Sequence, residues 1–355
     1  MKKKHLLVTR YSICILLLII VQISKALPSW GQVYASSVYP VISSSLSAFS
    51  SLFPFSLGDV FIALSIIGLI FWLLFGGFRR VGFRKRILPA VEYLLWVYIW
   101  FYLAWGLNYS QAGFYQRTGV QPVAYNQESF NSFLDNYIER LNDSYVPIKE
   151  MDKKYVQEII IDEYKKADLN PGIHTLKVKP RVKTMLCSPL YSMVGVSGYM
   201  GPFFCEFNIN NELPISQYPA TYAHELSHSL GITNEAEANF YAYLVCSRSD
   251  CHIVRFCGYF SVMNYVLNNA RSFVSEDEYK DIIDRINPEI INLANENRLH
   301  WQEKYSPVIG NIQNKIYNLY LKGNKISSGT KNYSEVVGLI ISWVSYENIA
   351  SCSNK

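Results

Sequence analysis

Charge is scarce in this chain of 355 residues, and it is unevenly distributed. Only 17% of the residues are charged, whereas 50% are hydrophobic and 15% are aromatic. The sequence contains no zinc-finger spacing, no phosphate-binding loop and no basic recognition stripe, so we expect no nucleic-acid partner. The net charge of +5 comes largely from two clusters near the N-terminus. It therefore indicates membrane topology rather than nucleic-acid binding.

Cys-x-x-Cys pairs are also absent, which argues against a cysteine zinc site. Besides Cys14, six cysteines lie in the C-terminal half of the chain: Cys187, Cys205, Cys246, Cys251, Cys257 and Cys352. In an oxidising compartment these six allow up to three disulfides, and Cys246 and Cys251 flank a polar turn that favours a local pair. Buried free thiols are the alternative.

Long apolar runs are confined to the first hundred or so residues. Three segments approach the ~20 residues that a helix needs to cross a bilayer: about 11–27, 58–76 and 88–107. The first is either an uncleaved helix, which we favour, or a signal peptide ending near Ala26. A buried hairpin in a soluble domain is the alternative for the other two. We expect a membrane region over residues 1–107.

Lysine and arginine are missing from residues 28–57, between the first two apolar segments. They cluster instead before the first segment and between the second and third: Lys2, Lys3, Lys4, Arg10, Arg79, Arg80, Arg84, Lys85 and Arg86. The positive-inside rule makes both clusters cytoplasmic. Residues 108–355 are then expected to form a domain that faces the periplasm or the cell exterior.

The remainder of the chain predicts a mostly helical α+β domain. Residues 126–168 carry apolar side chains at helical spacings of three and four, and residues 255–345 look mostly helical. Two strands are expected, a weak one over 175–183 and one over 203–210 beside the candidate site. The glycine-rich run 194–202 predicts a loop that borders a cleft. The late apolar run Val336 to Val344 is too short to cross a bilayer.

The most informative motif is His224-Glu-Leu-Ser-His228. On a helix the two histidines lie one turn apart, so both imidazoles can reach one metal ion. Glu225 projects beside them, where it can take a proton from metal-bound water. With only six histidines in the chain, a chance match is expected ~0.01 times or less. A pair of buried, hydrogen-bonded histidines is the alternative.

The residues around the motif predict a helix, a sharp turn and a second helix. Pro219 suits a first helical turn, Gly231 suits a left-handed C-cap, and Asn234 suits the next N-cap. Glu235 then begins the second helix and points back toward the turn, so it is the most readily supplied third ligand. A solvated acid in the first turn is its alternative role. Glu237 competes as a ligand, but it also suits the reciprocal half of a capping box with Asn234.

These motifs resemble a family of bacterial membrane proteins known as domain of unknown function 3810. The segment Glu235–Leu244, following His-Glu-Leu-Ser-His closely, carries much of the resemblance. Other matching pieces are Trp105–Tyr109, Val196–Tyr199, Phe207–Asn210 and Lys331–Val337. The resemblance extends over most of the chain from about residue 90. It implies a peptidase-like protein among the zincins whose third ligand is a glutamate, and it supplies no substrate.

The resemblance also assigns roles within Glu235-Ala-Glu-Ala-Asn239. Glu235 takes the ligand place, and Asn239, one turn further on, is expected to orient a ligand by a hydrogen bond. The implied cofactor is one Zn²⁺ per chain. Three residues are candidates to stabilise an oxyanion: Tyr199, Tyr241 and Arg248.

The sequence thus predicts a membrane-anchored, zincin-like zinc metallopeptidase in contact with a lipid bilayer and a peptide or protein substrate. Glu225 would act as the general base. Two alternatives remain open. One is a non-catalytic or regulatory membrane protein that keeps the fold, and the other is a zinc amidase that acts on cell-wall peptides.

Overall fold

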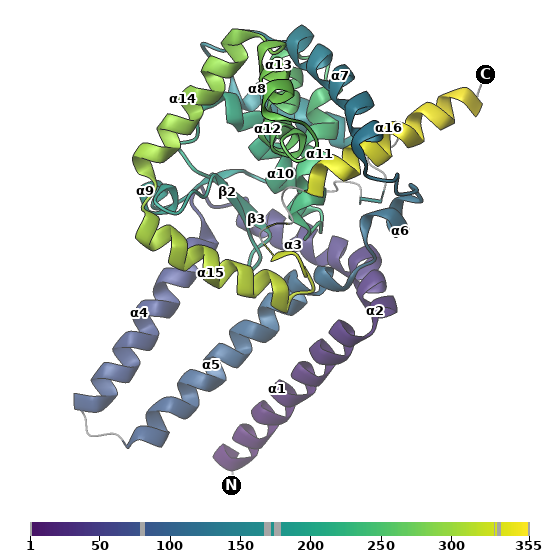
Figure 1. The fold of residues 1–355 in the computed structure, drawn as a ribbon. Helices are drawn as coiled ribbons and strands as arrows, with labels where there is room; N and C mark the ends of the chain where they lie inside the picture. The colour runs from purple at the N-terminus through teal and green to yellow at the C-terminus, as the bar shows by residue number, and fades with distance from the viewer. Residues whose placement is uncertain are drawn as a thin grey trace. The chain divides into compact units, whose positions relative to one another are not determined.

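The chain is mostly helical (Figure 1). Its described residues form a small mixed sheet of three strands in the order β1-β3-β2. A computed structural model describes residues 2–78, 82–166, 172–173, 179–329, 331 and 335–353. The described chain falls into two compact units. The first comprises Met1–Ala112, Pro180–Leu186 and Met200–Asn208, and the second comprises Gly113–Lys179, Cys187–Tyr199 and Ile209–Lys355. The predicted division at residue 108 remains a prediction.

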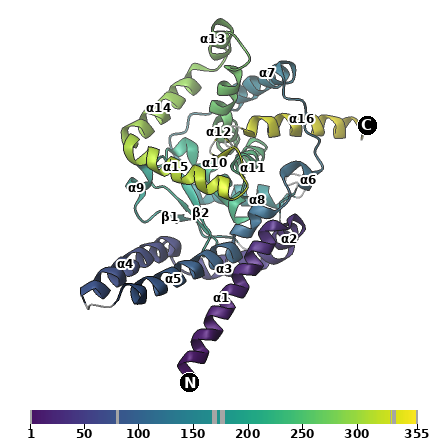
Figure 2. The same cartoon turned by 60° about the horizontal axis from the view of Figure 1, so that its bottom comes forward.

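The described residues of the first unit form the α-helices α1 (Lys2–Ala26), α2 (Pro28–Val33), α3 (Tyr39–Ser50), α4 (Leu57–Phe78) and α5 (Phe83–Ala104). A π-helical turn, Tyr34–Val38, precedes α3, and a 3-10 turn, Gly106–Ser110, follows α5. Helix α1 packs beside α5, and α5 packs beside α4 (Figure 2).

Three of these helices are long and apolar enough to cross a membrane, over Val8–Ala26, Leu57–Phe75 and Phe83–Ala104. Only 11% of the second span is buried, so its apolar side chains face outward. This exposure argues against a buried hairpin in a soluble domain and fits lipid contact. The helices therefore suggest a multi-pass membrane protein. Arg79 and Arg80 of the second basic cluster lie outside the described residues.

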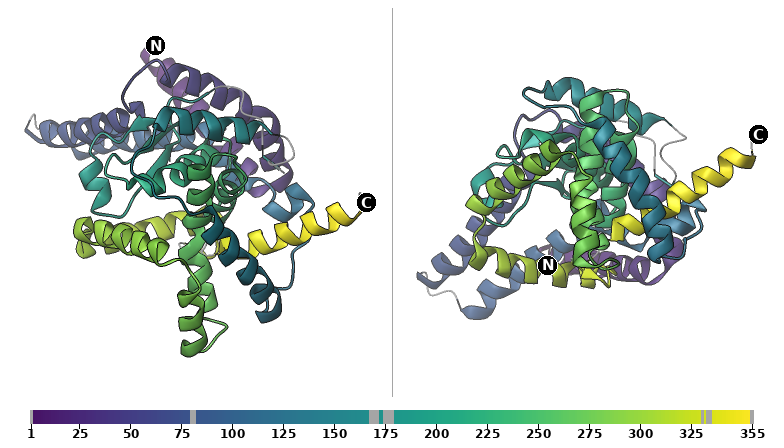
Figure 3. Two further views of the ribbon diagram at one scale, coloured as in Figure 1. Left: turned by 90° about the horizontal axis from the view of Figure 1, so that it is seen from above. Right: turned by 45° about the horizontal axis from the view of Figure 1, so that its top comes forward.

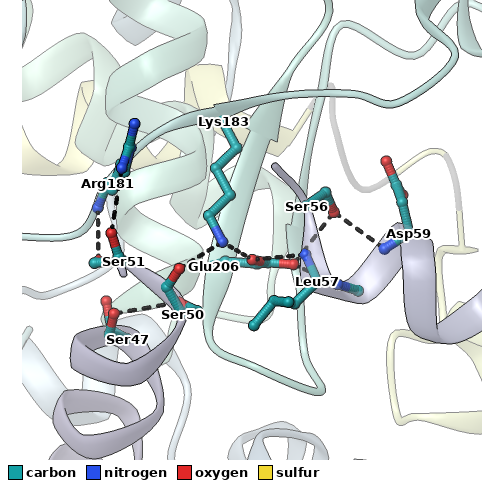
Figure 4. Close-up of polar contacts among 10 residues, drawn as sticks. Ser47, Ser50, Ser51, Ser56, Leu57, Asp59, Arg181, Lys183 and Glu206 are labelled. Carbon is teal, nitrogen blue, oxygen red and sulfur yellow. Dashed lines mark hydrogen bonds and ion pairs between the residues drawn. The ribbon is translucent and has the colours of Figure 1, made fainter. Parts of the chain in front are cut away.

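A buried ion pair connects the strands of the first unit to its helices (Figure 4). Glu206 of β3 (Glu206–Ile209) pairs with Lys183 of β1 (Lys183–Thr184), and both side chains are fully buried. Lys183 Nζ also donates to the Ser50 carbonyl at the end of α3, 2.8 Å away. The Glu206 carboxylate accepts from the Gly58 N–H and from the Ser56 hydroxyl at the start of α4. It thereby satisfies donors that a helix N-terminus leaves unpaired.

In the second unit, α10 (Tyr218–Ser229), α11 (Glu235–Ser247) and α12 (His252–Ala270) pack on one another (Figure 3). The others are α6 (Phe114–Thr118), α7 (Gln127–Ser144), α8 (Lys153–Lys165), α9 (Ser188–Ser192), α13 (Glu276–Asp284), α14 (Pro288–Lys304), α15 (Pro307–Gly323) and α16 (Val336–Ser353), with a 3-10 turn over Ile215–Gln217. Helix α16 packs on α11. Its apolar part, Val336–Ile349, is shorter than the three candidate spans and is not counted among them.

The strands differ from their prediction. Of the weak strand predicted over 175–183, residues 175–178 lie outside the described residues, and β1 covers only Lys183–Thr184. The predicted strand over 203–210 is shorter, because 202–205 form a turn in which Cys205 has a positive φ of 46°. Within the predicted loop 194–202, Gly198–Gly201 forms strand β2. Pairing in the sheet outweighs the low strand propensity of its two glycines.

Candidate metal centre

The metal-site residues come from two consecutive helices joined by a sharp turn. Helix α10 has Pro219 in its first turn, and Gly231, just after its end, adopts a φ of 95°. That conformation is accessible to glycine at little cost. The Asn234 side chain then accepts from the Glu237 N–H at 3.0 Å and starts α11 at Glu235. The turn thus returns Glu235 to the end of the helix that carries both histidines.

Three ligand atoms converge at this point. The Nε2 atoms of His224 and His228 lie 3.0 Å apart. Glu235 Oε2 lies 3.2 Å from the first and 3.3 Å from the second. Ligand atoms of a tetrahedral zinc with bonds of ~2.0–2.1 Å are about 3.3 Å apart. The three side chains can therefore hold a metal ion with little movement.

The outer nitrogens of both imidazoles are already engaged. His228 Nδ1 donates to the Ile232 carbonyl at 2.7 Å, and His224 Nδ1 lies 2.8 Å from Asn239 Oδ1. Donation from Nδ1 leaves the lone pair of a neutral imidazole on Nε2, which faces Glu235. This is how metal-binding histidines are commonly oriented by groups around the site.

The electrostatics of the cluster favour a cation between these groups. Burial alone lowers the pKa of His228, but the carboxylates of Glu235 and Glu225 and the Ile232 carbonyl raise it to about 9. Burial raises the pKa of Glu235, yet the two histidines hold it well below its usual range. The buried carboxylate is thus ionised and attracts positive charge, either a proton on His228 or a metal ion.

These shifts predict opposite pH responses for the metal-free and metal-bound protein. In the metal-free protein the raised pKa of His228 stabilises the fold below about 6.5, and this stability is lost as the pH rises through about 9. Metal binding needs the neutral imidazole and therefore strengthens over the same range. We expect the difference between the melting temperatures with and without zinc to widen from pH 6 to pH 9. A constant difference would contradict this coupling.

Glu225 lies beside the histidines on α10 but is turned toward strand β2. Its side chain is buried, and burial raises the pKa of its carboxyl, although the nearby histidines oppose this shift. A Cβ atom at Gly198 would come within 2.6 Å of Glu225 Oε1. Only glycine leaves room for the carboxylate at this point of the strand. The sequence did not single out Gly198 for this role.

Comparison with known proteins places the chain in a family. The family model described as "Protein of unknown function (DUF3810)" matches residues 34–341. The chain belongs to this family. The predicted resemblance is thereby confirmed, while the family description names no activity. No curated protein and no solved structure matches the chain.

In this DUF3810 family member, a tyrosine from a distant helix completes the surroundings of Glu235. Tyr317 of α15 donates from its hydroxyl to Glu235 Oε1 at 2.6 Å. This bond leaves Oε2 directed at the histidines and helps to fix the carboxylate. Tyr317 lies 82 residues beyond Glu235, and nothing in the sequence around it indicates the contact.

Glu237, the alternative ligand, is engaged elsewhere. Its carboxylate pairs with Arg117 of α6, and both side chains are almost fully buried. The predicted reciprocal cap is therefore only half formed: Asn234 accepts from the Glu237 N–H, but the Glu237 carboxylate turns to Arg117 because a buried guanidinium offers a stronger partner. The sequence did not single out Arg117 as a partner of Glu237. Tyr241 is held by a side-chain hydrogen bond to the same arginine.

The other two candidates to stabilise an oxyanion occupy different surroundings. Arg248 pairs with Glu347 and lies over the Trp343 ring, both on α16. Tyr199 follows Gly198 in β2 and stacks on Tyr191 with ring centroids 5.4 Å apart. Of the three candidates, Tyr199 is the one that follows Gly198, the residue that leaves room for the Glu225 carboxylate.

The described cysteines are free thiols. Cys246 and Cys251 do not form the expected local disulfide. Cys246 is buried within α11, and burial raises the pKa of its thiol above the ordinary value. Cys251 instead precedes α12, where it caps no N–H with its side chain. The side chain of Cys352 lies outside the described residues.

Proposed function

We propose that this protein is a membrane-anchored zinc metallopeptidase with a zincin-like catalytic domain. One observation carries the proposal: Nε2 of His224, Nε2 of His228 and Oε2 of Glu235 converge within 3.3 Å of one another, and Glu225 stands beside them without being one of the three. Two imidazoles and one carboxylate form the ligand set of catalytic rather than structural zinc sites.

The chemistry follows from the donor set. Zinc bound by three protein ligands keeps a position for water, lowers the pKa of that water and polarises a scissile carbonyl. Glu225 supplies the base: its carboxylate accepts a proton and returns it to the leaving amine. Burial raises the pKa of Glu225, which suits a group that must both accept and donate a proton near neutral pH.

Glu225 also favours an enzyme over a binding protein that keeps the fold. Burying a carboxylate without a charged partner costs free energy, and a catalytic role for Glu225 would account for such a residue at this position. Its neighbour Gly198 has no side chain, which leaves space for the carboxylate. A module that only binds needs no general base in this position.

We further propose that the second unit faces the periplasm or the cell exterior. The support is the distribution of charge, since Lys and Arg cluster before the first span and between the second and third and are missing from residues 28–57. The proposed substrate is a peptide or protein, and the bilayer is the other partner.

The first test is metal content. The full chain, purified in detergent, is expected to carry about one zinc per molecule. His228→Ala is expected to lose it, whereas His252→Ala, a change at an exposed histidine at the start of α12, is expected to retain it. A folded protein that takes up no zinc even from zinc-supplemented buffer would overturn the proposal.

A further inference from the structure

Helix α15 exposes a continuous apolar face. Val308, Ile312, Ile316 and Leu319 are 72%, 57%, 64% and 70% exposed, respectively. Their spacings of four, four and three place them along one side of the helix. Soluble surfaces expose single apolar residues freely, but contiguous rows of this kind mark a site of interaction.

The charge around this face has a single sign. Residues 304–334 contain no Asp or Glu, and the helix itself carries Lys315 and Lys322, both exposed. At 100° per residue, both lysines lie on the same flank of the apolar side. An apolar face bordered by lysine is the pattern of a helix that lies in the interface of an anionic membrane.

The connectivity of the chain is a further argument that lipid is the partner of this face. The first unit holds the three candidate spans, and the chain passes between the two units five times, after residues 112, 179, 186, 199 and 208. Only eight residues, 105–112, separate the end of the third span from the second unit. Such a segment extends for at most about 30 Å. The second unit, which contains α15, is therefore tethered to the candidate spans by a short segment.

The opposite side of α15 faces the metal centre. Tyr317 lies roughly 140° around the helix from the middle of the apolar face, and its hydroxyl donates a hydrogen bond to Glu235. Gly310 and Leu321, on the same side as Tyr317, are buried. One side of this helix thus exposes an apolar face, and the other side carries the tyrosine whose hydroxyl holds the Glu235 carboxylate.

We propose that α15 is a membrane-binding helix, whose apolar face inserts into the interfacial region of an anionic bilayer while Tyr317 holds Glu235. The occupant of the exposed face is lipid. Docking in this way keeps the candidate metal centre close to the membrane surface. Membrane binding by α15 does not require that the site be catalytic.

The test uses nitroxide labels on the full chain in vesicles of phosphatidylcholine and phosphatidylglycerol. Cysteine is introduced at Ile312, Ile316 or Leu319, with Asn311 and Asn314, on another side of the same helix, as matched controls. Cys187, Cys251 and Cys352 are first replaced by serine. Oxygen is expected to reach the three labels on the apolar face more than a nickel chelate does, and the order is expected to reverse at the two controls.

Two outcomes would overturn the proposal. Free access of the nickel chelate to all five labels would place the apolar face in water. Exclusion of both reagents from Ile316→Cys and Leu319→Cys would mean that protein covers the face, and spin–spin broadening would identify that protein as a second copy of the chain. Unchanged melting of each labelled variant ensures that the comparison concerns the folded protein.

Discussion

Replacing Glu225 by glutamine is expected to lower the rate of peptide hydrolysis by a factor of about 10²–10⁴ or more while the metal stays bound. Glutamine has the same shape, so it fits beside Gly198, but it cannot accept a proton. Metal binding should persist because the three ligand atoms belong to His224, His228 and Glu235. The expected result is therefore a loss of activity that is separated from any loss of zinc.

The measurement combines zinc content with cleavage of a peptide library and of cell-wall fragments. Glu276→Gln, at the exposed start of α13, is the matched control and should behave as the unaltered protein. Persistent hydrolysis by Glu225→Gln would rule out Glu225 as the base. A zinc-loaded protein that cleaves neither type of substrate would favour the non-catalytic alternative. Cleavage of the fragments alone would favour the cell-wall amidase.

Replacing Lys183 by methionine is expected to destabilise the protein by about 3–5 kcal/mol, because it leaves the Glu206 carboxylate buried without its cation. Both side chains of this pair are fully buried, and water cannot replace the missing charge. The remaining N–H donors at the start of α4 stabilise the carboxylate only in part. Denaturant unfolding of the full chain in detergent measures the loss.

Two variants serve as controls for this prediction. Lys179→Met breaks an exposed ion pair with Glu158 and should cost less than about 1 kcal/mol. The double variant Lys183→Met/Glu206→Gln should be more stable than Lys183→Met alone, since it removes the uncompensated charge. An effect of Lys183→Met no larger than that of Lys179→Met would show that the pair contributes little.

The parts of the site that the sequence predicted depend on neighbouring residues. A proline and a glycine mark the two ends of α10, an asparagine marks the start of α11, and all three act on the backbone within a turn or two. The spacing of His224 and His228 likewise follows from the helix repeat alone. The apolar segments were recognisable for a similar reason, because span length is a property of one continuous stretch.

The parts that the sequence did not predict depend on tertiary contacts. Arg117 reaches Glu237 across 120 residues, and Tyr317 reaches Glu235 across 82. Each looks like an ordinary surface or helix residue in its own segment. The strands were misjudged for the same reason, since β2 is rich in glycine and forms through its partner in the sheet rather than through its own preference.

The buried carboxylate of Glu206 has a consequence for the order in which the protein is made. It caps helix α4 from a position 148 residues later than Gly58. The three candidate spans are therefore synthesised, and available for insertion, well before the residue that completes the start of α4 leaves the ribosome. Until then the first turn of this helix and the end of α3 lack their buried partners. The helices of the first unit can reach their final packing only after more than half of the chain has been translated.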